Sequence, residues 1–236
     1  MQSLLYERHY KLKNNDKIQI CIPTVEEIIA REDEYYNLIY ILTAMPIDFM
    51  VQLDNAGVDF TTIDDYELFL RLFPIIQQMD TSLIFGDLDL TEFNIGVSEA
   101  DNKIVLINIK NEIEINQSVQ REIASVLRRL HNLKKNSKKP ANQDAKDFML
   151  ERAKAKIKRK KRESNSELEP LIISLVNTPE FKYNFDEVKK LTIYQFNESA
   201  KQIIKKIDYN NKMFGVYSGS ISVKDLKKDD LNWLTR

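Results

Sequence analysis

The chain has 236 residues, of which 43% are hydrophobic and 30% are charged, which suffices for one large domain or two small ones with a substantial core. Its single cysteine excludes an internal disulfide, and its longest apolar stretch, residues 35–51, is too short and too polar to span a bilayer. The net charge of −1 conceals a strong asymmetry, because residues 26–101 contain seventeen acidic and two basic residues, whereas residues 128–162 contain fifteen basic and three acidic ones.

The chain begins with a predicted β-hairpin and a predicted helix. Residues 4–12 and 18–22 are strand-like runs separated by a polar turn. Thr24 and Glu27 then have the spacing of a capping box, in which each side chain satisfies a free backbone amide of the first helical turn. The apolar pattern that follows predicts one continuous helix to about Ala44.

Two further helices are expected before the middle of the chain. Pro46 suits the first turn of one helix, and Gly57 is its predicted end. Thr62 is expected to cap the next helix, whose last turn is threatened by Pro74 because proline lacks a backbone N–H.

The middle of the chain changes to β-structure. Residues 93–97 and 104–109 predict two strands, and residues 113–115 predict a short third one. Asn116 is expected to cap a helix that ends near His131. The basic and polar residues 134–140 are the best candidate for a boundary between two portions.

Beyond this boundary the sequence predicts almost only helix. The expected helices cover residues 143–162, residues 166–176, a short segment near Asp186, and a long final helix. The fold class is therefore α+β and predominantly helical, with small antiparallel β elements in the N-terminal half and a helical C-terminal half. The predicted portions are residues 1–133 and residues 141–236, which can also pack as one domain.

The long final helix, residues 192–214, gives the clearest signal. Thr192 and Gln195 form a capping box, and Gly215 is the predicted end of the helix. Its apolar residues recur every three or four positions and are Ile193, Phe196, Ala200, Ile203, Ile204, Ile207 and Phe214. Such an apolar stripe needs another apolar surface to cover it. The core of this chain is the leading interpretation, and the alternative is a protein interface formed by Phe196, Ile203, Ile207 and Phe214. The tail after Gly215 is expected to dock.

The strongest local charge feature is a basic run in which eight of eleven residues are cationic. These residues are Arg152, Lys154, Lys156, Lys158, Arg159, Lys160, Lys161 and Arg162. Like charges three and four positions apart repel one another in a helix, so an anionic neighbour is expected. We consider a solvated or subunit-facing helix, the acidic half of this chain, an acidic protein partner, and nucleic acid as alternatives.

One acidic stretch imitates a catalytic loop. Asp87 and Asn94 resemble the base and the metal-binding asparagine of aminoglycoside-type phosphotransferases, but their spacing of seven is too wide and no glycine-rich loop precedes them. Asp87, Asp89 and Glu92 are also candidates for calcium, without the remaining ligands of a twelve-residue loop. We therefore predict no catalytic residue, no metal site and no cofactor, and we expect a protein that is not an enzyme.

Several segments resemble a known group of proteins. Residues 22–29, which read Ile-Pro-Thr-Val-Glu-Glu-Ile-Ile, are the clearest, with residues 34–36, 80–83, 86–88, 191–196 and 231–234 beside them. They are similar to uncharacterised proteins encoded in the tail gene clusters of phages and prophages of Gram-positive bacteria, a type that resembles phage tail assembly chaperones. The shared motifs are structural, so they identify no binding residue.

The resemblance implies a soluble, non-enzymatic tail assembly factor that binds the tape-measure protein, the tail-tube protein or both. Self-association is a further possible contact, and the host cytoplasm is the expected location. The first alternative is a structural virion protein of the tail or baseplate. The second is a nucleic-acid-binding protein that uses the basic helix, and no contact with a membrane is expected.

Overall fold

The structure is a computed structural model that describes residues 3–98, 102–159 and 166–234. About 55% of the described residues are helical and 9% are in strands, which confirms the predicted α+β class. The helices are α1 Val25–Ile29, α2 Glu32–Thr43, α3 Met50–Asn55, α4 Asp65–Ile76, α5 Ser82–Phe85, α6 Gln117–Leu130, α7 Gln143–Arg159, α8 Leu168–Val176, α9 Phe185–Lys190 and α10 Ile193–Tyr217. The strands are β1 His9–Lys11, β2 Gln19–Cys21, β3 Asn94–Val97, β4 Ile104–Asn108 and β5 Ile113–Ile115. Short 3-10 segments are η1 Pro46–Phe49, η2 Leu90–Glu92, η3 Val223–Asp225 and η4 Lys228–Leu231.

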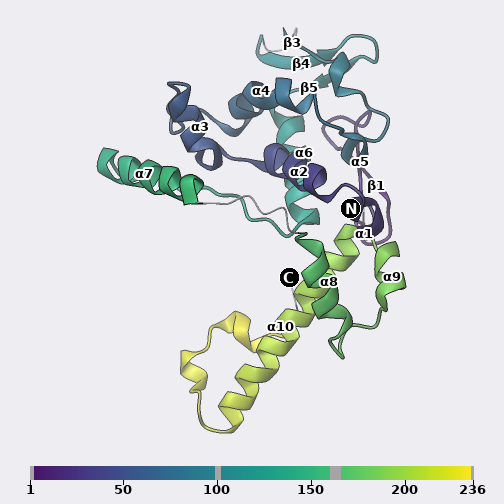
Figure 1. The fold of residues 1–236 in the computed structure, drawn as a ribbon, viewed down its shortest axis with the longest axis vertical. Helices are drawn as coiled ribbons and strands as arrows, with labels where there is room; N and C mark the ends of the chain where they lie inside the picture. Colours follow the sequence, from purple (N-terminus) through teal and green to yellow (C-terminus); the bar gives the residue numbers. More distant parts are fainter. Residues whose placement is uncertain (1–2, 99–101, 160–165, 235–236) are drawn as a thin grey trace.

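Both sheets lie in the N-terminal half, as predicted (Figure 1). β1 and β2 pair antiparallel with Tyr10 opposite Ile20, which confirms the hairpin, although residues 4–8 turn instead of lengthening the first strand. β3, β4 and β5 form an antiparallel sheet in that order. The Tyr66 hydroxyl of α4 donates to the carbonyls of Ile104 and Ile115, at 3.2 and 2.8 Å, and so joins this sheet to the helices.

The first predicted helix is interrupted. The capping box is present, since the Thr24 hydroxyl accepts from the Glu27 amide and the Glu27 carboxylate accepts from the Thr24 amide. The prediction of one continuous helix is nevertheless wrong, because Arg31 leaves the helical region at φ −147° and ψ 43° and separates α1 from α2. The break places Glu32 at the start of α8, where its carboxylate accepts from the amides of residues 167 and 168.

Helix α4 differs from its prediction at both ends. Asp64, and not Thr62, is its cap, and its carboxylate accepts from the Glu67 amide at 2.8 Å. Pro74 lies inside the helix, which continues to Ile76. A proline this close to the C-terminus removes one internal hydrogen bond and leaves the preceding turns intact.

Helix α6 packs at the centre of the N-terminal half (Figure 1). Asn116 caps it as predicted, because its side chain accepts from the amides of Ser118 and Val119. Helix α6 contacts both α2 and α4, and its residues Ile123 and Leu127 are buried.

The two predicted portions share one hydrophobic core. Leu38 and Leu127 from the first portion belong to the same buried cluster as Leu168, Phe181 and Phe196 from the second. A boundary at residues 134–140 therefore stays a prediction. In the described part of the chain, no helix has the length and apolar character needed to cross a bilayer.

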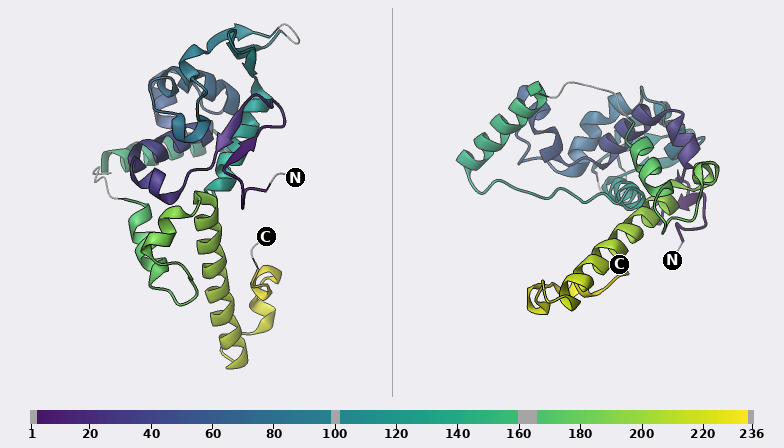
Figure 2. Two further views of the ribbon diagram at one scale, coloured as in Figure 1. Left: turned by 90° about the vertical axis from the view of Figure 1, so that its right-hand side faces the viewer. Right: turned by 60° about the horizontal axis from the view of Figure 1, so that its bottom comes forward.

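The C-terminal segment ends in an arm. Helix α10 is fixed at its beginning, where the Ile193 amide donates to the Pro23 carbonyl at 2.8 Å and the Val25 amide donates to the Leu191 carbonyl at 2.9 Å. From this base α10 extends away from the rest of the molecule, and the tail that contains η3 and η4 lies beside its outer part (Figure 2). We call α10 after Ala200, together with residues 218–234, the arm.

Candidate functional site

The apolar stripe of α10 belongs partly to the core and partly to the surface. The Phe196 side chain is 0% exposed, Ala200 is buried and Ile203 packs against the core. Farther along the same stripe, Ile207 is 38% exposed and Phe214 is 75% exposed. The core interpretation therefore holds for the first half of the stripe, whereas Ile207 is partly exposed and Phe214 is largely exposed.

The same face of α10 continues past its predicted end. Gly215 lies within the helix, which ends at Tyr217, so the predicted end at Gly215 is wrong. A Cβ atom at Gly215 would lie 2.5 Å from the Ile221 side chain, so the glycine provides the space in which the tail turns back. Gly219, at φ +76°, adopts the left-handed conformation that this turn requires.

Ion pairs help to hold the tail, residues 218–234, against the outer part of α10. Lys205 pairs with Asp229 at 3.1 Å, and Lys212 pairs with both Asp208 and Asp230, at 2.6 and 2.7 Å. The tail thus docks as predicted. The Lys205 and Lys212 side chains are only 18% and 28% exposed, so the tail covers much of both cations.

The arm carries a concentration of exposed apolar side chains. They are Ile204, Ile207, Phe214, Tyr217, Val223, Leu231, Trp233 and Leu234. A hollow of about 650 Å³ lies between Ile204, Leu234 and Leu171 of α8. Exposed apolar side chains commonly mark a binding surface where they adjoin one another, so the arm is the candidate binding surface.

The basic run lies on a different element, which points away from the arm (Figures 1 and 2). Helix α7 holds Arg152, Lys154, Lys156, Lys158 and the backbone of Arg159, and it contacts α3. Lys154 forms an ion pair of 2.6 Å with Asp54 of α3, so the acidic half of the chain neutralises part of the run, one of the alternatives considered. Lys160, Lys161 and Arg162 lie outside the described residues.

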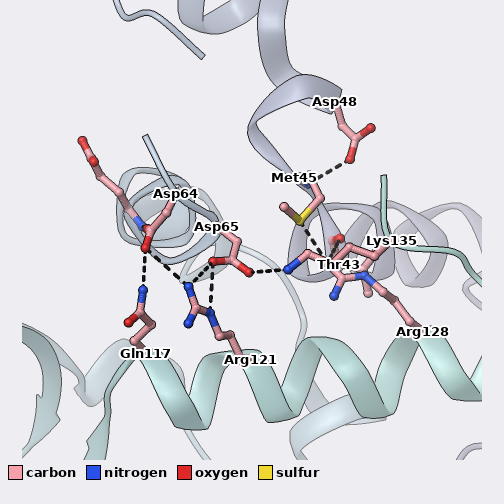
Figure 3. Close-up of polar contacts among 10 residues, drawn as sticks. Thr43, Met45, Asp48, Asp64, Asp65, Gln117, Arg121, Arg128 and Lys135 are labelled. Carbon is pink, nitrogen blue, oxygen red and sulfur yellow. Dashed lines mark hydrogen bonds and ion pairs between the residues drawn. The ribbon is translucent and has the colours of Figure 1, made fainter. Parts of the chain in front are cut away.

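A cluster of polar side chains around Asp65 positions the segment that precedes α7 (Figure 3). The sequence did not indicate this cluster. Asp65, whose side chain is 6% exposed, accepts hydrogen bonds from Arg121 of α6 and from Lys135, at 3.0 and 3.1 Å. Asn136 donates to the Asp48 carboxylate at 2.8 Å. These bonds fix residues 135 and 136 against α4 and η1. The only signal in the sequence was an aspartate in the first turn of an amphipathic helix, and this signal is common.

Asp65 is held ionised by its partners. Burial alone would raise its pKa, but the hydrogen bonds and charges of Arg121 and Lys135 outweigh burial and lower the pKa. A carboxylate whose pKa is lowered by folding stabilises the fold above its unfolded value, and this contribution disappears as the pH falls through the lowered pKa.

We expect Asp65→Asn to reduce the free energy of unfolding at pH 7 by about 1–3 kcal/mol, because two cations lose their carboxylate. The deficit relative to the unmodified protein should shrink in strong acid, where Asp65 itself is protonated. Urea unfolding at pH 7 and in strong acid measures this difference. Asp87→Asn, at an exposed site, is the matched control and should change stability by less than about 0.5 kcal/mol. An equal loss in both variants would contradict the assignment.

The acidic stretch that imitates a catalytic loop has structural contacts. The Asp89 carboxylate accepts from the Thr91 amide at 2.8 Å, and Glu92 pairs with Lys110 at 2.7 Å. Asp87 is exposed. Within the described residues, no group of three or more potential metal ligands is assembled. The phosphotransferase-like and calcium interpretations therefore receive no support from this geometry.

A hollow of about 930 Å³ lies between α4 and the β3–β4 hairpin and has a mainly apolar lining that includes Leu70, Pro74 and Ile95. Its acidic side chains already have partners. Glu67 pairs with Arg71 at 2.9 Å, and Asp64 lies 3.6 Å from Arg121. These carboxylates therefore do not form a convergent acidic site.

The fold and these surfaces define a predominantly helical protein with a projecting apolar arm. Comparison with known proteins adds one match: the family model of the YomV second domain matches residues 158–236. That family is phage-derived and occurs in a Bacillus prophage. The matched region contains α8, α9, α10 and the tail, so it includes the whole arm. No curated protein and no solved structure matches the chain. The match is consistent with a phage protein, and the resemblance to tail assembly chaperones stays a prediction.

Proposed function

We propose that the protein is a non-enzymatic, chaperone-like phage tail assembly factor that binds the tape-measure protein, tail-tube proteins or both through its arm. The observation that carries this proposal is the division of one helical stripe. The stripe is buried at Phe196 and exposed at Phe214, in a region that matches a phage-derived family.

Physical reasoning supports a protein partner for the arm. Burying a side chain such as that of Phe214 contributes about 1.5–3 kcal/mol, so a few anchors along one helix are enough for measurable association. The outer stripe presents Ile207, Phe214 and Tyr217 at helical spacing, which suits an apolar groove or the apolar face of another helix. Contacts of this limited size favour reversible binding, as an assembly factor needs.

Co-expression tests the proposal. The tagged protein should copurify with the tape-measure or tail-tube protein encoded beside it, and Phe214→Ser combined with Tyr217→Ser should abolish copurification, because the two largest exposed anchors are lost. Ile109→Ser, at another highly exposed apolar side chain, is the matched control and should leave it unchanged. Circular dichroism verifies that all variants are folded. Failure of the unmodified protein to copurify with either partner counts against the proposal.

Mass spectrometry of purified phage particles distinguishes an assembly factor from a structural protein of the tail or baseplate. An assembly factor acts in the host cytoplasm and leaves before the particle is complete, so the protein should be absent from virions. Its presence at the level of known tail proteins would favour the structural alternative.

A further inference from the structure

Helix α7 has two ridges with different environments. The inner ridge consists of Lys146, Leu150 and Lys154, which are spaced by four residues and therefore lie on one side of the helix. Leu150 is buried, Lys146 pairs with Asp59 at 2.6 Å, and Lys154 pairs with Asp54 at 2.6 Å. This side of α7 thus binds a surface that combines carboxylates with apolar groups.

The outer ridge has similar chemistry but, in the described part of the chain, no carboxylate partner. Phe148, Arg152 and Lys156 are again spaced by four residues, on the opposite side of the helix. Phe148 is 60% exposed, and the Arg152 guanidinium lies 5.6 Å from the centre of its ring. Among the described residues, no carboxylate lies within ion-pair distance of Arg152 or Lys156. Helix α7 projects from the rest of the molecule (Figure 1), and the side chains of Arg152 and Lys156 are exposed.

We propose that the outer ridge of α7 is a docking site for an acidic helical segment of a partner protein, which places an apolar side chain on Phe148 and carboxylates on Arg152 and Lys156. The inner ridge shows within this chain that α7 accepts such a surface. The site goes beyond the arm, since it lies on another element and uses charge as well as apolar contact.

The charges and the aromatic group favour an acidic protein segment over nucleic acid. The phosphate backbone of a duplex would neutralise the cations but would leave the Phe148 ring without an apolar contact, because paired bases are stacked inside the duplex. Asp147 and Glu151 lie on the flank of α7, and Asp54 lies behind it. These carboxylates repel a dense polyanion more than a helix that carries only a few charges.

Three fluorescent probes test the site. The first is an alanine-rich peptide of about 18 residues, long enough to form a helix, with Leu, Glu and Glu spaced by four. The second replaces its Leu with Gln, and the third is a DNA duplex of mixed sequence. Anisotropy titrations at about 0.05 M and 0.15 M salt compare their affinities.

We expect the Leu peptide to bind best, with an affinity that falls as salt rises. Arg152→Glu combined with Lys156→Glu should weaken its binding about tenfold or more, because like charges then face each other. Phe148→Ala should remove the preference for the Leu peptide over the Gln peptide. Lys224→Glu combined with Lys228→Glu makes the same charge change on the exposed tail and should have no effect.

Two results would overturn the proposal. One is equal binding of the Leu peptide by the unmodified protein and by the doubly reversed α7 variant. The other is tighter binding of the duplex than of either peptide, unaffected by Phe148→Ala, which would assign the ridge to nucleic acid. The variant with Phe214→Ser and Tyr217→Ser should retain peptide binding. The result of this test is therefore independent of the function proposed for the arm.

Discussion

Phe196→Ala is expected to lower the free energy of unfolding by about 3–5 kcal/mol, the cost typical of removing a fully buried aromatic ring. Phe214→Ala makes the same chemical change on the same stripe of α10 and should alter stability by no more than about 0.5 kcal/mol. The difference arises because Phe196 is 0% exposed and contacts the Phe181 ring, whereas Phe214 is 75% exposed.

Urea unfolding of the two variants, followed by circular dichroism, measures this contrast. The two phenylalanines lie eighteen positions apart, about 27 Å along the helix at 1.5 Å per residue. Their local helix propensity is the same, so a difference must come from tertiary packing. Equal losses would mean that the outer stripe is covered in solution, and an unaffected Phe196→Ala variant would show that the inner stripe is not core. Either result would contradict the division on which the proposed function depends.

Most of the helix caps in this chain can be predicted from signals that act within one helical turn. The caps at Thr24, Asn116 and Thr192 were read correctly because a capping side chain and its target amide are at most three residues apart. Pro46 likewise opens a helical segment, and Gly57, at φ +71°, follows its end. Such contacts do not depend on the rest of the fold.

Long-range contacts explain the errors. No local signal in the sequence marks the break at Arg31, and Glu32, which follows it, accepts hydrogen bonds from residues 166–168, more than a hundred positions away. Thr62 and Asp64 are both good capping residues, but the Thr62 hydroxyl donates to the Asp59 carbonyl at 2.9 Å in the preceding turn, and Asp64 caps α4. Helix α10 passes through Gly215 because the tail returns against it.

The sequence predicts the residues of the candidate sites, but it does not predict which of them are exposed or paired. The spacing of Phe196, Ile203, Ile207 and Phe214 predicted one apolar face but did not indicate where the core ends along it. That point is set by how far α10 extends beyond its neighbours. The basic run predicted an anionic neighbour, yet Asp54 is one hundred positions from Lys154, so the pairing became visible only in the structure.

Acidification between pH 6.5 and pH 4 should destabilise the protein through one side chain, His131. Its imidazole lies at the end of α6, where Nε2 is 2.9 Å from the Tyr35 hydroxyl and the ring contacts Tyr36. Burial lowers the pKa of His131 from its ordinary 6.5 to about 4. Burial also raises the pKa of Tyr35 well above its ordinary value, so the phenol remains protonated and can donate to the neutral imidazole.

The sign follows from proton binding. Between pH 4 and pH 6.5 the unfolded chain binds a proton at His131 and the folded chain does not, so stability rises with pH in this window. Above pH 6.5 both states are neutral at this site and the effect vanishes. A pKa lowered by 2.5 units corresponds to about 3 kcal/mol in total, of which about 2 kcal/mol is lost between pH 7 and pH 5.

The expected result is a steeper fall in the free energy of unfolding for the unmodified protein than for His131→Gln between pH 7 and pH 5. Glutamine does not titrate and can still accept from Tyr35, so the difference between the two isolates the histidine from the carboxylates. The chain has only two histidines, which allows NMR titration to follow His131 directly. A midpoint near pH 4 agrees with a desolvated ring, whereas a midpoint near 6.5 would mean that the junction of α2 and α6 is open to water.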